Sequence, residues 1–304
     1  MSVRISVITP TYNRAAVLGR VFESLMNQTN KEFEWIIIDD GSKDDTKTVV
    51  EGYVSKANFQ IKYVYQDNNG KHIAINKGVE LAIGEFIAIA DSDDSFIPTA
   101  FEVMLDYWDR ISPGERELYR GITCRCYDPD TGEKIGRSIK DGYEDYYGID
   151  ATYKYGLDFE MWGINRTDLM RKFPFPDIRR TDNGGLSFFP EIVIWDNMGR
   201  NYKTRYIDDC LRAYYRDQEN ATTNKTGSRS RENVYLWEHL INDIFDYAKY
   251  KPMRFIKALV GLSMDNLLIG KKFFDIVKIG NTPIKRLLIT VLFPVGWALY
   301  IKKR

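Results

Sequence analysis

Three carboxylates stand within four residues of this sequence, at residues 91–94 (DSDD), directly after the apolar run 86–90. Carboxylates this close repel one another in a folded protein, and a divalent cation is a common compensation. Hard oxygen ligands suit Mg²⁺ or Mn²⁺, which also bridge phosphate groups. The pattern predicts a metal–phosphate site, and the structural alternative is an exposed acidic turn.

Two further polar groups follow strand-like runs. Residues 10–14 (PTYNR) come after the run 5–9, and residues 39–42 (DDGS) come after the run 35–38. Tyr12 can stack on a flat base, and a carboxylate at a strand end can accept a hydrogen bond from a base imino group. The alternatives are a core or surface tyrosine and aspartates that cap the next helix. No G-x-G-x-x-G follows the first run, which disfavours a dinucleotide-dependent dehydrogenase.

The elements that must position these groups alternate between strand and helix patterns over the first hundred residues. The expected strands are residues 5–9, 35–38, 61–65 and 86–90. The expected helices are residues 17–26, residues 73–83 closed by Gly84, and a helix that starts near Pro98. Strand–helix alternation with short links predicts an α/β fold with a mostly parallel sheet flanked by helices. Ligands bind at the carboxyl ends of such strands, where the three polar groups stand.

Five segments in register resemble family 2 glycosyltransferases. They are Ser6-Val7-Ile8-Thr9-Pro10-Thr11-Tyr12-Asn13, Ile38-Asp39-Asp40-Gly41-Ser42, Ala74-x-Asn76-Lys77-Gly78, Gly84-Glu85-Phe86 and Asp91-Ser92-Asp93-Asp94. The resemblance is strong from Val3 to Trp108 and fades through Tyr215. It implies a GT-A fold, an inverting reaction and a nucleotide-diphosphate sugar as donor, usually a UDP-sugar.

The resemblance also implies where the nucleotide base is held. Pro10 and Tyr12 would border the base, with Tyr12 stacking on it. Asp40 would hold the uracil edge, with Asp39 beside it.

The sugar and diphosphate would lie against the Asp-x-Asp segment. Asp91 would face the ribose and the sugar, while Asp93 and Asp94 would serve the metal, Mn²⁺ or Mg²⁺, and the diphosphate. The resemblance does not settle which of the last two aspartates is the main metal ligand. Lys71 stands where the family often places a basic donor contact. His72 is either a contact to donor or acceptor or a satisfied turn histidine.

The general base is expected about a hundred residues past the aspartates, where the family commonly shows an acidic pair. The matching stretch 188–195 (FFPEIVIW) retains one acid, Glu191, which we predict to be the catalytic base. Its alternative role is that of a helix N-terminal glutamate favoured by the helix dipole. Trp162 either stacks on an acceptor sugar or belongs to the core. The rival acids are Asp182, Asp158 and Glu160.

The chain divides into a catalytic region and a helical tail. Residues 1–220 are expected to form one GT-A domain, with a donor half at 1–111 and an acceptor half at 112–220. A polar loop ends this domain, and residues 231–304 form a helical C-terminal extension. Its expected helices are residues 234–248, 255–268 and 287–301.

The end of the extension carries a membrane signal. Residues 287–301 are uncharged and lie between Lys285-Arg286 and Lys302-Lys303-Arg304. A span needs about 20 apolar residues, and Pro294 and Gly296 interrupt this run of 15, so an interfacial or re-entrant anchor fits better. The alternative is a core helix packed on the body. Residues 249–304 carry a net charge of +10 and the preceding residues −10. Because the basic residues alternate with apolar stretches, an anionic membrane is favoured over nucleic acid as partner.

Composition limits the cellular compartments and the kinds of metal site that are compatible with this sequence. The 304 residues hold 44% hydrophobic residues, enough for a buried core, and only two His, which excludes a histidine-rich metal site. Three Cys without a zinc or redox spacing indicate reduced thiols. The N-terminus shows no signal peptide. We therefore expect a cytoplasmic enzyme, peripheral at the inner face of the cell membrane.

The resemblance, together with the basic and apolar tail, implies a hexosyl- or N-acetylhexosaminyl-transferase whose acceptor is a lipid-linked glycan or surface polysaccharide. A sugar-nucleotide nucleotidyltransferase is the alternative enzyme, but residues 10–14 are not the Gly-rich basic loop that such enzymes usually carry. A non-catalytic glycan-binding or membrane scaffold protein is the third alternative. The intact aspartates at 91–94 argue against it.

Overall fold

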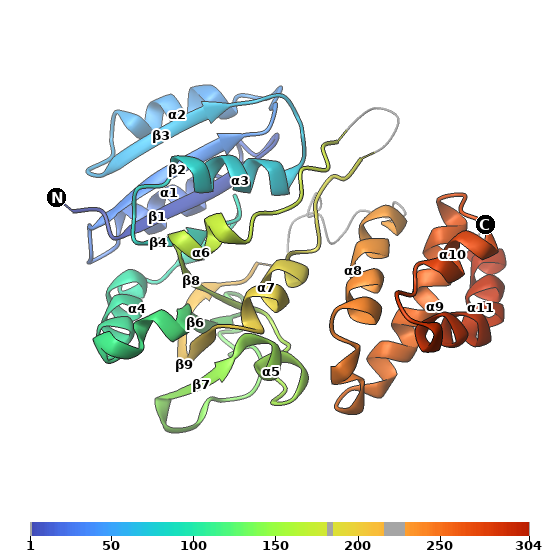
Figure 1. The fold of residues 1–304 in the computed structure, drawn as a ribbon. Coiled ribbons are helices and arrows are strands. Elements are labelled where there is room, and N and C mark those ends of the chain that lie inside the picture. Colours follow the sequence, from blue (N-terminus) through green and yellow to red (C-terminus); the bar gives the residue numbers. More distant parts are fainter. Residues whose placement is uncertain (1, 181–184, 216–228, 304) are drawn as a thin grey trace.

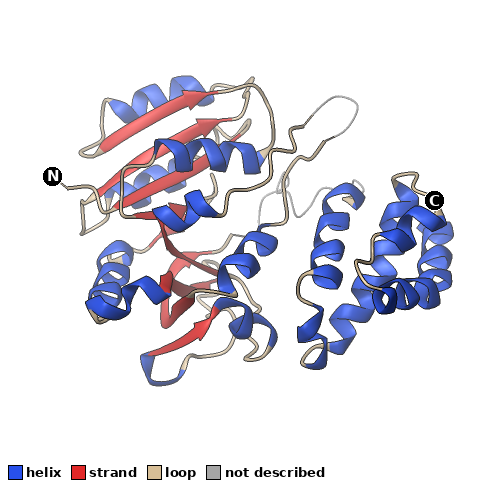
Figure 2. Cartoon of the chain, in the orientation of Figure 1, coloured by secondary structure: helices blue, strands red, loops and turns tan. Residues whose placement is uncertain are grey.

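The structure is a computed structural model that describes residues 2–180, 185–215 and 229–303. Within these ranges one nine-stranded sheet carries helices on both faces, and a helical extension follows it (Figures 1 and 2). The strands are β1 (Ile5–Thr11), β2 (Phe33–Asp39), β3 (Gln60–Tyr65), β4 (Phe86–Ile89), β5 (Ser95–Phe96), β6 (Tyr119–Tyr127), β7 (Tyr143–Tyr147), β8 (Met161–Arg166) and β9 (Lys203–Ala213). The helices of the sheet domain are α1 (Gly19–Met26), α2 (Thr46–Val54), α3 (Lys71–Leu81), α4 (Ala100–Asp109), α5 (Gly148–Tyr153), α6 (Thr167–Lys172) and α7 (Glu191–Gly199).

The strand order is β3-β2-β1-β4-β8-β6-β9-β5, and β7 pairs with β9. Strands β3, β2, β1 and β4 are mutually parallel, as the strand–helix alternation predicts. Beyond β4 the sheet is mixed, because β8 runs antiparallel to both β4 and β6. The expected α/β fold is confirmed, and its parallel part is formed by strands β1 to β4.

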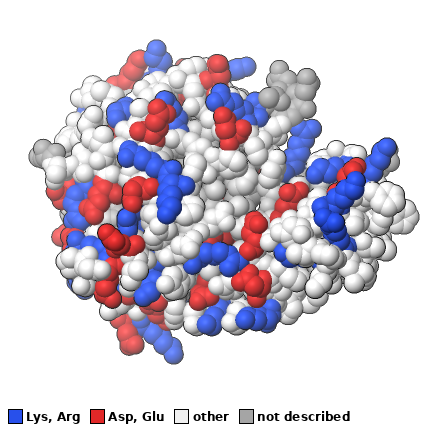
Figure 3. All heavy atoms as spheres, in the orientation of Figure 1, with Lys and Arg blue, Asp and Glu red and all other residues white. Residues whose placement is uncertain are grey.

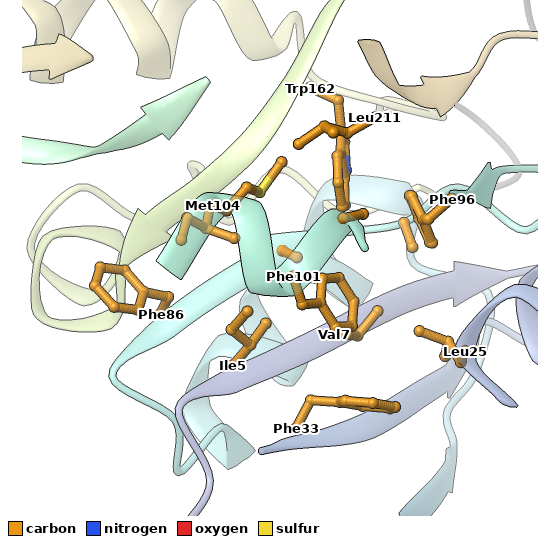
Figure 4. Close-up of a cluster of buried hydrophobic side chains, with 14 of the residues drawn as sticks. Ile5, Val7, Leu25, Phe33, Phe86, Phe96, Phe101, Met104, Trp162 and Leu211 are labelled. Atoms are coloured by element: carbon orange, nitrogen blue, oxygen red, sulfur yellow. The ribbon is translucent and has the colours of Figure 1, made fainter. Parts of the chain in front are cut away.

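The core has two layers because successive side chains of a strand point to opposite faces. Ile5 and Val7 of β1 pack with Phe33 and Phe101 on the face covered by α1 and α4 (Figure 4). Ile8 points the other way, into a second cluster beneath α3 and α7. Strand β1 is buried along its whole length.

Helix α3 begins and ends two residues earlier than expected. It spans Lys71–Leu81, and Ala82 is already extended, so Gly84 is not its cap. Gly84 is needed for a different reason: a Cβ there would lie 2.7 Å from the Ser6 backbone nitrogen. Gly78 likewise lets α3 approach β1, since a Cβ would collide with Ile8.

The described part of residues 112–220, the expected acceptor half, contains four strands, β6 to β9. Buried arginines explain why β6 is hard to detect from hydrophobicity. Arg125 in β6 has a side chain only 3% exposed and pairs with Asp208 of β9 at 2.8 Å. Arg205 of β9 pairs with Asp145 of β7, also at 2.8 Å. Charged residues whose partners come from distant strands therefore replace the apolar alternation expected of a half-buried strand.

The extension consists of α8 (Ser230–Asn242), α9 (Pro252–Leu268), α10 (Phe273–Lys278) and α11 (Pro283–Lys303). Helix α8 is shorter than predicted, since a separate 3-10 turn covers Phe245–Lys249, and α10 was not predicted. A buried carboxylate joins α8 to α9: Asp265 accepts hydrogen bonds from Ser230 Oγ at 2.6 Å and Trp237 Nε1 at 2.8 Å. Tyr153 of α5 belongs to the same apolar cluster as the extension, which ties the extension to the sheet domain.

Candidate active site

A cleft of about 890 Å³ opens where β1, β2 and β4 end. The described lining includes most of the residues singled out by the sequence, which are Pro10, Tyr12, Asp40, Lys71, Asp91, Asp93, Asp94 and Glu191. Asp39, which is buried beneath the cleft, does not line it, and neither do His72, Trp162 and Asp158. The carboxyl edge of the parallel strands thus gathers groups from separate parts of the chain.

The loops after β1 and β2 are held together by Asn13. Its backbone N–H donates to Ser42 Oγ at 2.8 Å, and its side-chain oxygen accepts from the Lys43 N–H at 2.7 Å. Asn13 has a φ of +53°, a left-handed conformation that asparagine tolerates better than most residues. The turn presents Tyr12 to the cleft with 37% of its surface exposed.

Asp40 is buried and shapes the loop that leads into α3. One carboxylate oxygen accepts from Gln66 Nε2 at 2.7 Å and from the Asn69 N–H at 2.9 Å. The other accepts from the Gly70 N–H at 2.8 Å. Gly70 has a φ of +105°, and a Cβ there would lie 2.7 Å from the Leu186 carbonyl oxygen. Asp40 therefore lines the cleft and also fixes the backbone that places Lys71.

Asp39 supports the same wall from below. Its carboxylate accepts from the Ser42 N–H at 2.8 Å and from the Tyr63 hydroxyl at 2.6 Å. These bonds satisfy a carboxylate that is 1% exposed. Its contacts in this structure are those of a positioning residue.

Lys71, in the first turn of α3, joins two acids across the cleft. Its Nζ lies 2.7 Å from Asp91 Oδ1 and 3.0 Å from Glu191 Oε1. Burial alone would lower the pKa of Lys71, but the two carboxylates outweigh it and the pKa is raised. For Asp91, burial would raise the pKa, yet Lys71 outweighs it and lowers the pKa. Lys71 therefore stays charged and forms ion pairs with both Glu191 and Asp91.

The aspartates that follow Asp91 carry poorly compensated charge. Asp94 accepts a hydrogen bond from the Asp91 N–H at 2.9 Å and lies 3.5 Å from Arg212 of β9, which also pairs with Glu160. Burial, reinforced by Asp91 and Asp93, raises the pKa of Asp94 to about 7 despite Arg212. Burial and the Asp91 charge also raise the pKa of Asp93. The segment therefore favours binding of a cation or a proton.

The carboxylates of this segment suit a metal ion that is coordinated partly by the protein and partly by a substrate. Among the described residues no three His, Cys, Asp or Glu side chains converge as a ready-made metal cluster. Asp93 pairs with no other side chain in the described ranges, so its carboxylate is available. Mg²⁺ typically takes one or two carboxylates together with substrate phosphates and water. Asp93 and Asp94 fit that arrangement.

Comparison with known proteins agrees with this geometry. Residues 6–114 match the family described as Glycosyl transferase family 2. These residues are a family 2 glycosyltransferase domain. A relative is the GalNAc(5)-diNAcBac-PP-undecaprenol beta-1,3-glucosyltransferase of Campylobacter jejuni, 38% identical over 104 residues, 34% of this chain and 33% of the relative. The chain spans well under two thirds of the length of the curated relatives it matches.

Solved structures resemble the glycosyltransferase domain and the extension together. S. aureus TarS 1-349 in complex with UDP-GlcNAc superposes with a TM-score of 0.65 and 17% identity, covering 98% of this chain and 88% of that one. The mannosyltransferase PcManGT from Pyrobaculum calidifontis, in complex with GDP-Man and Mn²⁺, gives a TM-score of 0.50 at 14% identity, over 100% of this chain and 88% of that one. At these identities the likeness concerns the fold, which is of the GT-A type.

Of the rival acids, only Glu160 lines the glycosyltransferase cleft within the described ranges, and it is paired with Arg212. Asp158 pairs instead with Lys251 of the extension. Asp182 lies outside the described residues. Glu191 stays the predicted base, placed at the cleft by the first turn of α7.

Two aromatic residues have structural roles in this domain. His72 is 1% exposed and donates from Nε2 to the Ile178 carbonyl at 2.9 Å, while its Nδ1 has no hydrogen-bond partner among the described residues. Trp162 is buried, donates to the Ile89 carbonyl at 2.7 Å and stacks on Phe96 at 4.3 Å between ring centroids. Neither lines the cleft within the described residues.

Sequence reasoning missed cleft residues that come from beyond the family match. Arg212 arrives on β9, while Arg229 and Glu232 come from the start of α8. Glu232 accepts a hydrogen bond from the Ser187 N–H at 3.3 Å, and the Ser187 carbonyl accepts from the Lys71 N–H at 3.0 Å. A signal existed only for Arg212, a charged residue within a strand-like run. The extension therefore contributes to the wall of the cleft.

Proposed function

We propose that the chain is an inverting glycosyltransferase that moves a hexosyl or N-acetylhexosaminyl group from a UDP-sugar to a hydroxyl acceptor. The observation that carries the proposal is the convergence of Asp91, Asp93, Asp94, Lys71 and Glu191 on one cleft. The aspartates supply negative charge for a metal and its phosphates. The lysine and the glutamate form an ion pair at 3.0 Å, and a sugar bound beside this pair would meet both.

The nucleotide would occupy the end of the cleft formed by the loops after β1 and β2. Pro10 and Tyr12 would border the base, and Asp40 would face its polar edge, with Asp39 fixing the turn behind. The UDP-GlcNAc and UDP complexes of TarS support a uridine nucleotide. Asp40 Oδ2 keeps one lone pair for a base imino group, because each carboxylate oxygen accepts about two hydrogen bonds and, within the described ranges, Oδ2 accepts only from the Gly70 N–H.

Asp93 and Asp94 would hold Mn²⁺ or Mg²⁺. When bound, such an ion neutralises the charge that grows on the leaving diphosphate. The Mn²⁺ complex of PcManGT supports this choice. Asp91 would face the ribose and the sugar, held in place by Lys71.

Glu191 would act as the general base. The acceptor hydroxyl attacks the anomeric carbon from the face opposite the diphosphate, and its proton passes to a Glu191 carboxylate oxygen. The bond between the anomeric carbon and the diphosphate oxygen breaks as the new glycosidic bond forms, so the configuration inverts. Lys71, 3.0 Å from Glu191 Oε1, holds the carboxylate in place for this transfer.

The acceptor would be a lipid-linked glycan or surface polysaccharide at the cytoplasmic face of the membrane. The name of the Campylobacter jejuni relative, which places its substrate on undecaprenol, supports this acceptor class.

Purified full-length protein tests the proposal. Incubation with a panel of UDP- and GDP-sugars, with Mn²⁺ and with excess EDTA, should show metal-dependent release of UDP from at least one UDP-sugar. Proton NMR of the product should show inverted anomeric configuration. Release of pyrophosphate from a sugar phosphate and UTP, or no turnover of any donor, would overturn it.

A further inference from the structure

Helix α11 is held along one side by α9. It is the helix in the described ranges that is long and apolar enough to cross a membrane, with a mean hydropathy of 1.6. Its inner side is closely packed: a Cβ on Gly296 would lie 2.5 Å from Ser263 Cβ and 2.7 Å from the Val260 carbonyl oxygen. Ile289 on the same side is fully buried.

The outer side of α11 is apolar and uncovered. Ile284, Leu287, Val291 and Val295 follow one another at three- and four-residue spacing, so they share one side of the helix. They are 49–70% exposed. Phe274 of α10 is 74% exposed. Of the twenty large apolar side chains exposed among the described residues, nine lie between residues 269 and 301. A helix of an ordinary soluble domain turns its apolar side inward, and α11 carries apolar side chains on both.

Basic side chains surround this surface. Exposed lysines and arginines in the same segment are Lys271, Lys272, Lys278, Arg286, Lys302 and Lys303. Asp275 is the one acid between residues 271 and 303. Figure 3 shows both charges spread over the sheet domain and an uncharged area bordered by Lys and Arg on the extension. Figure 1 places α10 and α11 on the side of the extension away from the sheet.

We propose that α10 and the outer side of α11 form an in-plane binding surface for an anionic lipid bilayer. Apolar side chains would enter the interface, and the surrounding lysines and arginines would contact lipid phosphates. A crossing helix is disfavoured, because insertion would strip α11 from α9 and uncover Ile289 and its partners. A second copy of the chain is also disfavoured, because a symmetric dimer would bring two basic rims together.

The surface is tied to the cleft through a short path. Helix α11 packs on α9, α9 holds α8 through Asp265, and α8 begins beside Arg229 and Glu232 of the cleft wall. A bilayer bound at α11 would thus lie at a fixed height relative to the cleft. Such a position would bring a lipid-linked acceptor to the cleft, and this consequence rests on the proposed function. Lipid binding itself does not depend on the proposed function.

Vesicle flotation of the full-length protein tests the proposal without any substrate. Binding to phosphatidylglycerol–phosphatidylcholine vesicles should exceed binding to pure phosphatidylcholine and weaken with salt. Changing Leu287, Val291 and Val295 together to Ser should weaken binding at least about a hundredfold, since each loses its apolar burial in the interface. Lys302→Gln with Lys303→Gln should cost about fivefold per lysine at low salt.

Matched controls separate lipid binding from folding. Val54→Ser with Ile83→Ser removes exposed apolar side chains on the sheet domain and should leave flotation unchanged. Donor hydrolysis and thermal unfolding of each variant should match the parent protein. Flotation of the triple serine variant at the parental level would overturn the proposal, as would release of the parent only by detergent and not by carbonate, which indicates a crossing helix. A concentration-dependent dimer that the triple variant abolishes would assign the surface to a second copy.

Discussion

Replacing the predicted base is the sharpest test of the site. Glu191→Gln keeps the size and hydrogen bonding of the side chain but cannot take up a proton. A positioned general base contributes about 10²–10⁴-fold to a rate. At about 1.4 kcal/mol per tenfold, that corresponds to roughly 3–5 kcal/mol of activation free energy. We expect turnover to fall by at least about 100-fold.

The structure shows that the folding cost of this change is much smaller. The Glu191 side chain is 34% exposed, so its ion pair with Lys71 is worth about 1 kcal/mol or less. Its charge at the start of α7 adds about 0.3–1 kcal/mol through the helix dipole. The free energy of unfolding should therefore fall by no more than about 2 kcal/mol. A collapse in turnover with a well-folded protein would then report chemistry.

Donor hydrolysis provides the assay, with water as the acceptor, together with calorimetric titration of UDP in the presence of Mn²⁺. UDP affinity should stay near the parental value, because the proposed function places Glu191 beside the sugar and not beside the nucleotide. Glu160→Gln is the matched control, since Glu160 lines the same cleft but is paired with Arg212. If Glu191→Gln hydrolyses donor within about tenfold of the parent, the reasoning fails and Asp182→Asn becomes the next variant to measure.

Asp93→Asn or Asp94→Asn should lower turnover by at least about 100-fold, and full activity in excess EDTA would contradict a metal role. The pKa of Asp94 is raised above its unfolded value of about 3.9, so the stability this group contributes is lost as pH rises towards 7. Metal-free Asp94→Asn protein should therefore resist urea better than the parent above about pH 7, and equal midpoints would refute this. Asp40→Ala should weaken UDP binding more than it slows turnover at saturating UDP-sugar. It should also lower the free energy of unfolding by about 1–3 kcal/mol, because the N–H groups of Asn69 and Gly70 lose their acceptor. Unchanged UDP affinity would show that Asp40 does not bind the base. His239, held 2.9 Å from Asp243 and 3.2 Å from Asp196, has a raised pKa because these hydrogen bonds outweigh burial, which alone would lower it. The stabilisation by His239 is complete below about pH 6.5 and is lost as pH rises through the pKa of the folded state. The free energy of unfolding of His239→Gln should therefore fall less over that range than that of the parent. Parallel pH profiles of the two proteins would disprove this.

The parallel half of the sheet was predictable because its signals are local. Each strand there is a short apolar run that ends in a polar group, and parallel strands bring such ends to one edge. The strand ends alone therefore predict that Tyr12, Asp40 and Asp93 lie around one cleft, and all three line it. Element boundaries depend on less local contacts: α3 begins at Lys71 because Asp40, distant in sequence, accepts a hydrogen bond from the Gly70 N–H and fixes the first turn.

The second half of the sheet domain was not predictable from pattern, because its stabilising pairs join strands far apart in the chain. Arg212 and Asp94 form a contact although they lie 118 positions apart in the sequence, and no spacing rule predicts such a contact. The same holds for the bridge from Lys71 to Glu191, which only the packing of α7 beside α3 creates.

For the extension, the sequence by itself determined an uncharged run between basic residues, which permits a core helix, an interfacial helix or a span. Tertiary structure decided which side of that helix is already used. Gly296 lets α11 approach the α9 backbone, and this contact leaves Leu287, Val291 and Val295 facing outward. A hydropathy pattern counts apolar residues, whereas only the packed neighbours determine which of them remain in contact with water.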